Sequence, residues 1–126
     1  MNCPCQSGRP YAQCCHPWHQ GPLRLQAPTA EALMRSRYSA FVLDELAYLL
    51  DTWHPLTRPA ALEANPPGLK WLGLQIKRHI QTDDTHASVE FVARSRLNGR
   101  AHRLHEISRF ERTNGLWQYL DGEFPD

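Results

Sequence analysis

The sequence predicts an α+β fold that carries a small cysteine-rich module at its N-terminus. Three observations lead to this prediction: apolar residues recur at helical spacing in the first half, they alternate with polar residues in the second half, and all four cysteines lie within the first fifteen positions. A chain of 126 residues with 41% hydrophobic residues suffices for one core and a small appendage. We therefore expect a module at residues 1–27 and one domain at residues 28–126.

The composition limits which binding partners and which cellular compartment we expect for this protein. The 14 Lys and Arg residues against 13 Asp and Glu residues give a formal charge of +1, so net charge does not indicate nucleic acid as a partner. The sequence shows no leader pattern and no apolar run near the roughly 18 residues of a membrane span, so we expect a cytoplasmic protein with no membrane partner. Thiols in that compartment stay reduced, which favours metal or redox chemistry over structural disulfides.

The first element is a loop whose apolar residues are too scattered for a core. Its thiols follow a C-x-C pattern, an interval of eight residues and an adjacent pair: Cys3, Cys5, Cys14 and Cys15. The interval contains Ser7, Gly8 and Pro10, which favour turns that would bring the thiols together. Zinc takes four sulfur or nitrogen ligands in a tetrahedron at about 2.0 to 2.3 Å, so the pattern predicts a zinc site.

The alternatives to a zinc site are a disulfide and a redox pair. A disulfide between adjacent Cys14 and Cys15 would be strained, and the spacing of redox-active cysteine pairs is absent. The fourth ligand stays open, because His16 follows Cys15 directly. A site closed by four protein ligands leaves no position for substrate, so we expect a structural Zn²⁺. Arg9 would offset negative charge on the sulfurs, and residues 1–20 would be disordered without the metal.

The second element is a long helix over residues 29–54. Thr29 is a suitable N-cap, Glu31 stands in the first turn, and a break is expected near residues 43–45. The apolar side chains recur every three or four residues: Leu33, Met34, Tyr38, Phe41, Val42, Leu46, Leu49 and Leu50. The charged residues Arg35 and Arg37 most simply belong to a solvated face.

A connector follows the helix. Residues 54–69 contain four prolines and one glycine, which exclude a long regular element. At most one short helix fits, near residues 60–64.

The second half predicts an antiparallel meander of at least four strands. The expected strands are residues 70–82, 85–97, 100–113 and 116–124. Asn98-Gly99 and Asn114-Gly115 are the dipeptides that type I′ hairpin turns need, because both central residues adopt positive φ. On the first strand the apolar residues share one parity: Leu72, Leu74, Ile76 and Ile80. The helix would lie across one face of this sheet and bury it.

The cysteine segment, CPCQSGRPYAQCC, resembles the SEC-C motif, a zinc-binding motif best known from the tail of the SecA translocase ATPase. Gly8 and Tyr11 also stand where that motif has a glycine and an aromatic residue. The resemblance assigns four metal ligands: Cys3, Cys5, Cys14 and Cys15. The motif often ends on histidine, so His16 remains the alternative fourth ligand.

The whole chain is similar to the YchJ-like family of uncharacterised bacterial proteins. The segments that carry this resemblance are the SEC-C stretch, MRSRYSAF at residues 34–41 and HEISRF at residues 105–110. The family implies a cone-shaped nuclear transport factor 2-like, or cystatin-like, domain, in which a long helix packs on a curved antiparallel sheet. It implies no particular activity, because that fold serves many functions.

Residues of a possible pocket follow from this fold. The concave face of such a cone could hold a small molecule, and polar side chains there could act as acid and base. The candidate pocket residues are Trp71, His105, Glu106 and Arg109. The competing interpretation is that these charged residues form cross-strand ion pairs on an open face. Arg35 or Arg37 could instead reach an anionic ligand at the mouth of the cone.

The leading functional hypothesis is a binding or adaptor protein, with the zinc module contacting a protein partner and the cone holding a small molecule or peptide. One alternative is a small isomerase-like or hydratase-like enzyme that uses Glu106, His105 or Arg109 in the cone, although none of these is assigned as catalytic. A second is nucleic-acid or ribosome binding through the zinc module, which we do not favour because its basic residues are few: Arg9, Arg24, Arg35 and Arg37. Nothing in the sequence specifies the oligomeric state.

Overall fold

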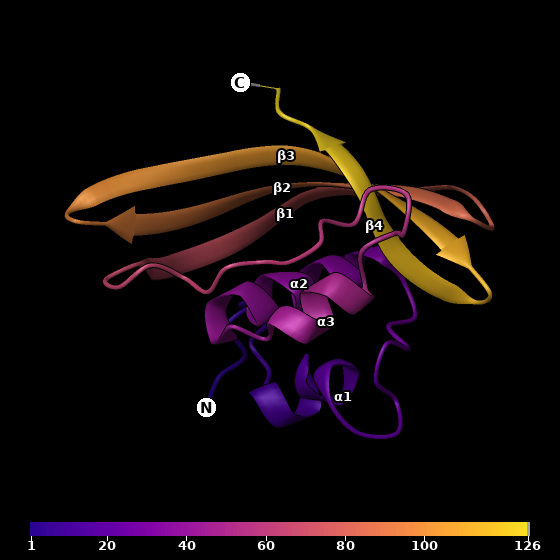
Figure 1. The fold of residues 1–126 in the computed structure, drawn as a ribbon, viewed down its shortest axis with the longest axis horizontal. Coiled ribbons are helices and arrows are strands. Elements are labelled where there is room, and N and C mark those ends of the chain that lie inside the picture. Colours follow the sequence, from indigo (N-terminus) through magenta and orange to yellow (C-terminus); the bar gives the residue numbers. More distant parts are fainter. Residues whose placement is uncertain (126) are drawn as a thin grey trace.

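The computed structural model describes residues 1–125, and it shows an α+β arrangement in which a four-stranded sheet covers a pair of helices. The elements in chain order are η1 (Tyr11–Gln13), α1 (His16–His19), α2 (Ala30–Leu43), α3 (Leu46–Asp51), β1 (Lys70–Asp83), β2 (His86–Leu97), β3 (Arg100–Thr113) and β4 (Leu116–Glu123). Figure 1 shows three layers, with the N-terminal module below α2 and α3 and the sheet above them. Helix α2 therefore lies in the middle layer of the molecule.

The segment expected as one long helix forms two helices. Helix α2 begins after Thr29, whose side chain accepts a hydrogen bond from the Ala32 N–H at 3.0 Å, as the cap prediction required. It ends at Asp44, which adopts the left-handed conformation with φ 56°. The Asp44 carboxylate accepts a hydrogen bond from the Asn65 N–H at 2.9 Å, which holds this break in place. The predicted break near residues 43–45 is confirmed.

The connector contains no helix at residues 60–64, which agrees with the expectation of at most one short helix there. Residues before proline disfavour helical backbone, and Asn65 precedes Pro66. Asn65 ties the end of the connector to α2 and β1, because its side-chain amide donates to the Phe41 carbonyl at 2.7 Å and accepts from Trp71 Nε1 at 3.4 Å.

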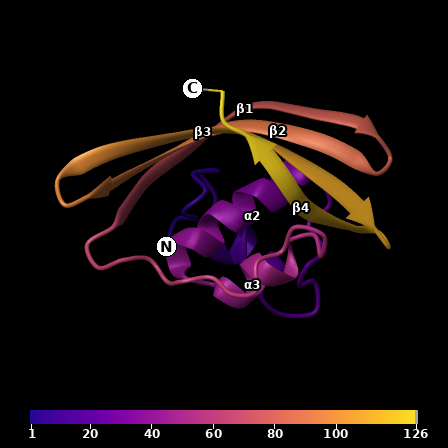
Figure 2. The same cartoon turned by 45° about the horizontal axis from the view of Figure 1, so that its top comes forward.

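The sheet has the order β1-β2-β3-β4, and all neighbouring strands are antiparallel. Both predicted turns are confirmed: Asn98 and Gly99 have φ 53° and 76°, and Asn114 and Gly115 have φ 54° and 79°. Figure 2 shows the resulting sheet curving over α2. Because the turns set the register, they also decide which side chains face the helices.

The face predicted for β1 is partly wrong. Leu74 is buried as expected, but Leu72 and Ile80 are each 43% exposed. Register shifts between Trp71 and Gly73, and again further along β1, each insert one extra residue and reverse the alternation. Trp71 therefore points toward the helices in place of Leu72.

The core joins α2, α3 and the inner face of the sheet. Its buried large side chains include Leu33, Tyr48, Leu49, Val89, Phe91, Phe110 and Trp117. The four cysteines belong to the same buried cluster, so the module shares the core of the domain. Within residues 1–125, no helix is both long enough and apolar enough to cross a membrane.

Replacing Thr29 tests the start of α2. Thr29→Ala removes the acceptor of the Ala32 N–H, and we expect the free energy of unfolding to fall by about 1 kcal/mol. Thr29→Ser retains the hydroxyl and should stay within a few tenths of wild type. Urea unfolding followed by circular dichroism measures the stability of both variants. If both lose the same free energy of unfolding, the hydrogen bond to the Thr29 hydroxyl does not stabilise the helix.

Candidate metal centre and ligand cavity

The four thiols of the N-terminal module converge on one point. All four are buried and unoxidised, and their sulfur atoms lie within 4.8 Å of one another. The Cys5 and Cys14 Sγ atoms are 3.6 Å apart, and those of Cys14 and Cys15 are 4.0 Å apart. Sulfurs at about 2.3 Å from a tetrahedral ion are separated by roughly 3.8 Å, so these residues fit a metal ion bound by four thiolates.

The loop between the two cysteine pairs folds back as a small hairpin. Asn2 and Pro10 form an isolated antiparallel bridge, and the Cys3 N–H donates to the Arg9 carbonyl at 3.0 Å. Two residues at the bend have positive φ, Gln6 at 63° and Gly8 at 89°. The short helix η1 then returns the chain to Cys14 and Cys15.

Nearby groups stabilise negative charge on the sulfurs. The Ser7 hydroxyl lies 3.0 Å from Cys14 Sγ, and the Arg9 guanidinium donates to the same sulfur at 3.8 Å, which is the contact expected of Arg9. The hydrogen bond from Cys15 lowers the pKa of Cys5 to about 4, although burial opposes this. The same hydrogen bond raises the pKa of Cys15, because the donating thiol must keep its proton. A bound metal cation would instead stabilise the deprotonated form of the thiols, so that none of them would need to keep its proton.

The module is held against one side of α2 by polar contacts. Arg35 donates to the Cys5 carbonyl at 3.1 Å, and the Cys3 Sγ lies 3.5 Å from the Ser39 hydroxyl. His19 Nε2 is 2.8 Å from the Ser36 carbonyl, so it must donate there. The neutral ring then accepts from the Tyr11 hydroxyl at Nδ1, at 2.6 Å. Burial lowers the pKa of His19, which keeps this ring neutral.

The opposite side of α2 borders a cavity of about 390 Å³. Helix α2, the connector and the inner face of the sheet enclose it. Aromatic side chains supply much of its wall: Tyr38, Phe41, Trp53, Trp71, Phe91 and Tyr119. Two charged and well-buried side chains, Arg37 and Glu106, also line it.

Arg37 uses only part of its hydrogen-bonding capacity. It is 3% exposed, and its Nη1 donates to the Leu49 carbonyl at 2.8 Å and to the Thr52 hydroxyl at 2.7 Å. The guanidinium carbon lies 5.1 Å and 4.8 Å from the ring centres of Trp53 and Tyr119. Burial lowers the pKa of Arg37 to about 10, so it stays charged at neutral pH. Among residues 1–125, no group accepts a hydrogen bond from its Nε or Nη2.

Glu106 faces the same cavity and is 7% exposed. Its Oε2 accepts hydrogen bonds from Ser108 at 2.7 Å and from the Tyr119 hydroxyl at 2.8 Å. Burial and the adjacent Glu106 raise the pKa of Tyr119, which therefore remains a donor. A side chain on Gly122 would overlap the Glu106 carboxylate. Glu106 Oε1 receives no hydrogen bond from the described part of the chain.

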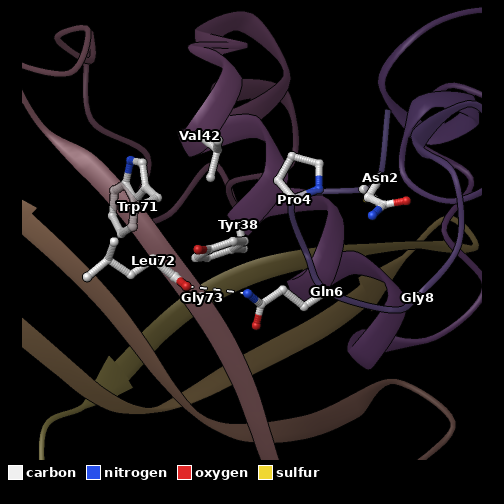
Figure 3. Close-up of a pocket in the computed structure, with 10 residues that line it drawn as sticks. Asn2, Pro4, Gln6, Gly8, Tyr38, Val42, Trp71, Leu72 and Gly73 are labelled. Carbon is white, nitrogen blue, oxygen red and sulfur yellow. Dashed lines mark hydrogen bonds between the residues drawn. The ribbon is translucent and has the colours of Figure 1, made fainter.

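A second pocket, of about 560 Å³, lies between the module and β1 (Figure 3). Gln6 crosses from the module and donates to the Leu72 carbonyl at 3.3 Å. Gly73 leaves room for this side chain, since a Cβ there would lie 2.8 Å from Gln6 Oε1. Tyr38 and Trp71 line this pocket and the 390 Å³ cavity alike. The module therefore reaches the cavity wall through these two aromatic residues.

Comparisons with known proteins agree with this two-part arrangement. Residues 29–122 match the family model described as the YchJ middle NTF2-like domain, and residues 2–17 match the SEC-C motif. The chain belongs to the YchJ-like family. A UPF0225 protein of Bordetella pertussis is 64% identical over 96% of this chain and 91% of its own length. A UPF0225 protein of Ralstonia nicotianae is 54% identical over 96% of this chain and 90% of its own length.

Two solved structures resemble this YchJ-like chain throughout. The solution structure of a SEC-C motif containing protein from Rhodopseudomonas palustris has 32% identity, a TM-score of 0.84 and full coverage of both chains. The crystal structure of a SEC-C motif containing protein from Psychrobacter arcticus has 33% identity and a TM-score of 0.77, over 94% of this chain and 80% of that one.

The YchJ-like fold brings the four predicted thiol ligands together, and the alternative ligand, His16, is not part of this cluster. His16 begins α1, and its ring packs against Tyr11 with ring centres 5.2 Å apart. Within residues 1–125, the group that could hold a metal ion consists of the four cysteines.

The four candidate pocket residues divide between the two faces of the sheet. Trp71 and Glu106 line the cavity. Side chains alternate between the two faces of a strand, and His105 and Arg109 each stand next to an inward-facing residue of β3. Both therefore project from the opposite face. There His105 Nε2 lies 2.7 Å from the Glu90 carboxylate, and Arg109 donates to Asp121 at 2.6 Å. These two pairs match the alternative of cross-strand ion pairs on an open face.

Sequence reasoning did not single out Tyr119, and it assigned Arg37 most simply to the solvated face of the helix. A signal for Arg37 was present: it lies three residues after Met34 and four before Phe41, inside the apolar stripe of α2. Tyr119 has no comparable signal, because only the β3–β4 pairing brings it beside Glu106.

Substitution of Cys15 and His16 tests the ligand set. We expect Cys15→Ser to weaken metal binding at least about tenfold. Removing a group that merely contacts a metal ligand already lowers metal affinity by about that factor. His16→Ala should leave the affinity within about twofold of wild type, because its ring lies against Tyr11. Competition with a chromophoric chelator measures both, and a larger effect of His16→Ala would reverse the assignment.

Proposed function

We propose that this protein binds a small molecule in the 390 Å³ cavity and that its four cysteines hold a structural Zn²⁺. One observation carries the first part of this proposal: Arg37 and Glu106 lie buried on the wall of an otherwise largely apolar cavity, each with unused hydrogen-bonding positions. The cavity volume lies within the range of roughly 300 to 1,000 Å³ that ligand sites occupy.

Stability alone does not account for these two charges. Burying a charged group is unfavourable unless it is well paired, and apolar replacements of buried ion pairs often stabilise proteins. Arg37 and Glu106 form no direct ion pair with each other among the described contacts, although Glu106 raises the pKa of Arg37 at longer range. Their retention is understandable if a ligand completes both sets of hydrogen bonds.

The cavity also indicates the chemistry of its ligand. Arg37 offers donors at Nε and Nη2, Glu106 offers an acceptor at Oε1, and the aromatic wall suits a flat apolar body. Because the two wall charges compensate each other, the ligand should be uncharged. A planar cyclic amide, which places an acceptor beside a donor, meets these requirements.

The proposed Zn²⁺ is structural. Thiolate ligands select soft ions, and a four-thiolate tetrahedron is typical of structural zinc. When bound, the ion would cross-link the two cysteine pairs, while the chain's own residues, Arg35 and His19 among them, hold the module on α2. The centre leaves no ligand position open for chemistry.

The other functional hypotheses have less support. The enzyme hypothesis relied on Glu106, His105 and Arg109, of which only Glu106 borders the cavity. The role of the module as a contact for a protein partner stays a prediction, and so does binding of a peptide.

A fragment screen tests the cavity. We expect planar cyclic amides to raise the melting temperature, by the equivalent of about 2.7 kcal/mol at a hundred times the dissociation constant. Glu106→Gln replaces an acceptor, so it should weaken those compounds at least about tenfold, while Glu90→Gln removes a carboxylate on the other face and should not. If the compounds bind both variants as tightly as they bind wild type, the proposed ligand site in the cavity is refuted.

Metal removal tests the structural role of zinc. Chelation should abolish hydrogen-exchange protection at residues 2–19, because metal binding supplies much of the folding energy of such a module. The amides of residues 87–93 in β2 should keep their protection, since the sheet has its own hydrogen bonds. Zn²⁺ should restore the module and Mg²⁺ should not, and protection unchanged by chelation would contradict the proposal.

A further inference from the structure

The cavity beside α2 has a buried end and an open end. Arg37 and Glu106 stand at the buried end, and both are well shielded from solvent. At the other end Leu104 of β3 lines the cavity although it is 41% exposed. The connector residues Glu63 and Ala64 on the wall are exposed as well. The mouth of the cavity therefore lies between β3 and the connector.

Polar side chains of the sheet continue outward from this mouth. Trp71 lines the cavity, and the strand register places Ser95 opposite Trp71 and His102 opposite Ser95. Directly opposed residues of neighbouring strands share a face, so Ser95 and His102 lie on the inner face, just beyond Leu104. The β2–β3 hairpin extends beyond the helices at this end (Figures 1 and 2), and His102 is exposed to solvent.

The connector side of the mouth presents a carboxylate. Glu63 is exposed, and among residues 1–125 no group forms a hydrogen bond or an ion pair with it. A carboxylate accepts hydrogen bonds from hydroxyl groups, whereas it repels the negative charge of a phosphate or of a second carboxylate. The mouth therefore suits a neutral group that carries hydroxyls.

The buried end limits which ring can bind there. Glu106 Oε2 already accepts hydrogen bonds from Ser108 and Tyr119, so Oε1 remains for one ligand N–H. Both hydrogen bonds of Arg37 come from Nη1, so Nε and Nη2 remain as a pair of donors. A carbonyl oxygen has two lone pairs for such a pair, whereas a ring nitrogen has one.

These positions discriminate among the bases of nucleic acids. Guanine offers two adjacent donors, of which Glu106 Oε1 could serve one. Cytosine and adenine have a ring nitrogen in place of the carbonyl oxygen. Uracil has one ring N–H beside a carbonyl, and the aromatic wall of the cavity suits its flat ring.

We propose that the ligand is a ribonucleoside whose base has one ring N–H beside a carbonyl, as uridine does. This inference rests on the small-molecule function proposed above for the cavity. Uridine carries its ribose at N1, on the side of the ring away from the N3–H and the C4 carbonyl. When that edge meets Arg37 and Glu106, the ribose lies at the mouth, where its hydroxyls reach Glu63 and the side of the sheet formed by Ser95 and His102.

Isothermal titration calorimetry with the metal-loaded full chain tests the orientation of the base. 1-Methyluracil keeps the N3–H and carries a methyl group where uridine has its ribose, so it should bind. 3-Methyluracil has lost the N–H that faces Glu106, and we expect it to bind at least about tenfold more weakly. Equal affinities of the two compounds would overturn the proposal.

The contribution of the ribose is measured with the same method. We expect uridine to bind at least about fivefold more tightly than 1-methyluracil, because its hydroxyls donate to a charged acceptor. Uridine 5′-monophosphate should bind more weakly than uridine, because Glu63 repels the phosphate.

A variant assigns this gain to the mouth. Glu63→Ala should reduce the advantage of uridine over 1-methyluracil to less than about twofold and should leave 1-methyluracil itself within about twofold of wild type. Glu123→Ala removes an exposed carboxylate from β4 and should change neither affinity. Urea unfolding checks that both variants are as stable as wild type.

Tighter binding of uridine that depends on Glu63 supports the proposal. The proposal is overturned if uridine binds no more tightly than 1-methyluracil, if Glu63→Ala retains the full advantage, or if the monophosphate binds as tightly as uridine. Each of these results leaves the cavity as a site for cyclic amides. If 1-methyluracil and uridine both fail to bind, the nucleoside is excluded, and the fragment screen with Glu106→Gln decides separately whether the cavity binds a ligand.

Discussion

Helix α2 is packed on both of its sides, and this double burial determines the positions of most other features. The sheet and the cavity lie against Met34, Arg37 and Tyr38, while the metal module lies against Ser36 and Ser39. A helix of a two-layer protein normally has one apolar stripe and one solvated face. Here the second face carries small serines that accept the close approach of Cys3 and His19.

This arrangement connects the metal centre to the cavity through a short path. Tyr38 and Trp71 stand between the module and the cavity, with ring centres 5.7 Å apart. Gln6, at the bend of the cysteine loop, reaches the backbone of β1 beside Trp71. A metal ion held by the four cysteines would therefore stabilise the loop that fixes one part of the cavity wall.

Local chemistry made much of the fold predictable. The Thr29 cap, the two Asn-Gly turns and the cysteine spacing each act over a few residues, so the sequence alone shows them. The errors arose where distant contacts decide. Bulges in β1 exchanged the faces of Leu72 and Trp71, and Arg37 is buried because Leu49, Thr52 and two aromatic rings surround it. The clustering of the four cysteines was predictable from their spacing, whereas the partition of His105 and Glu106 between faces needed the register of the sheet.

The two outermost strands of the sheet have consequences for solubility. A strand with one unpaired side is a template for association with other chains, and proteins protect such strands with bulges or with covering segments. On β4, Thr52 and His54 exchange backbone hydrogen bonds with Tyr119. On β1, the bulges and Gln6 of the metal module provide the protection. The cysteine loop therefore covers an edge strand that is prone to association, so any change that unfolds this loop exposes the backbone of β1 to self-association as well.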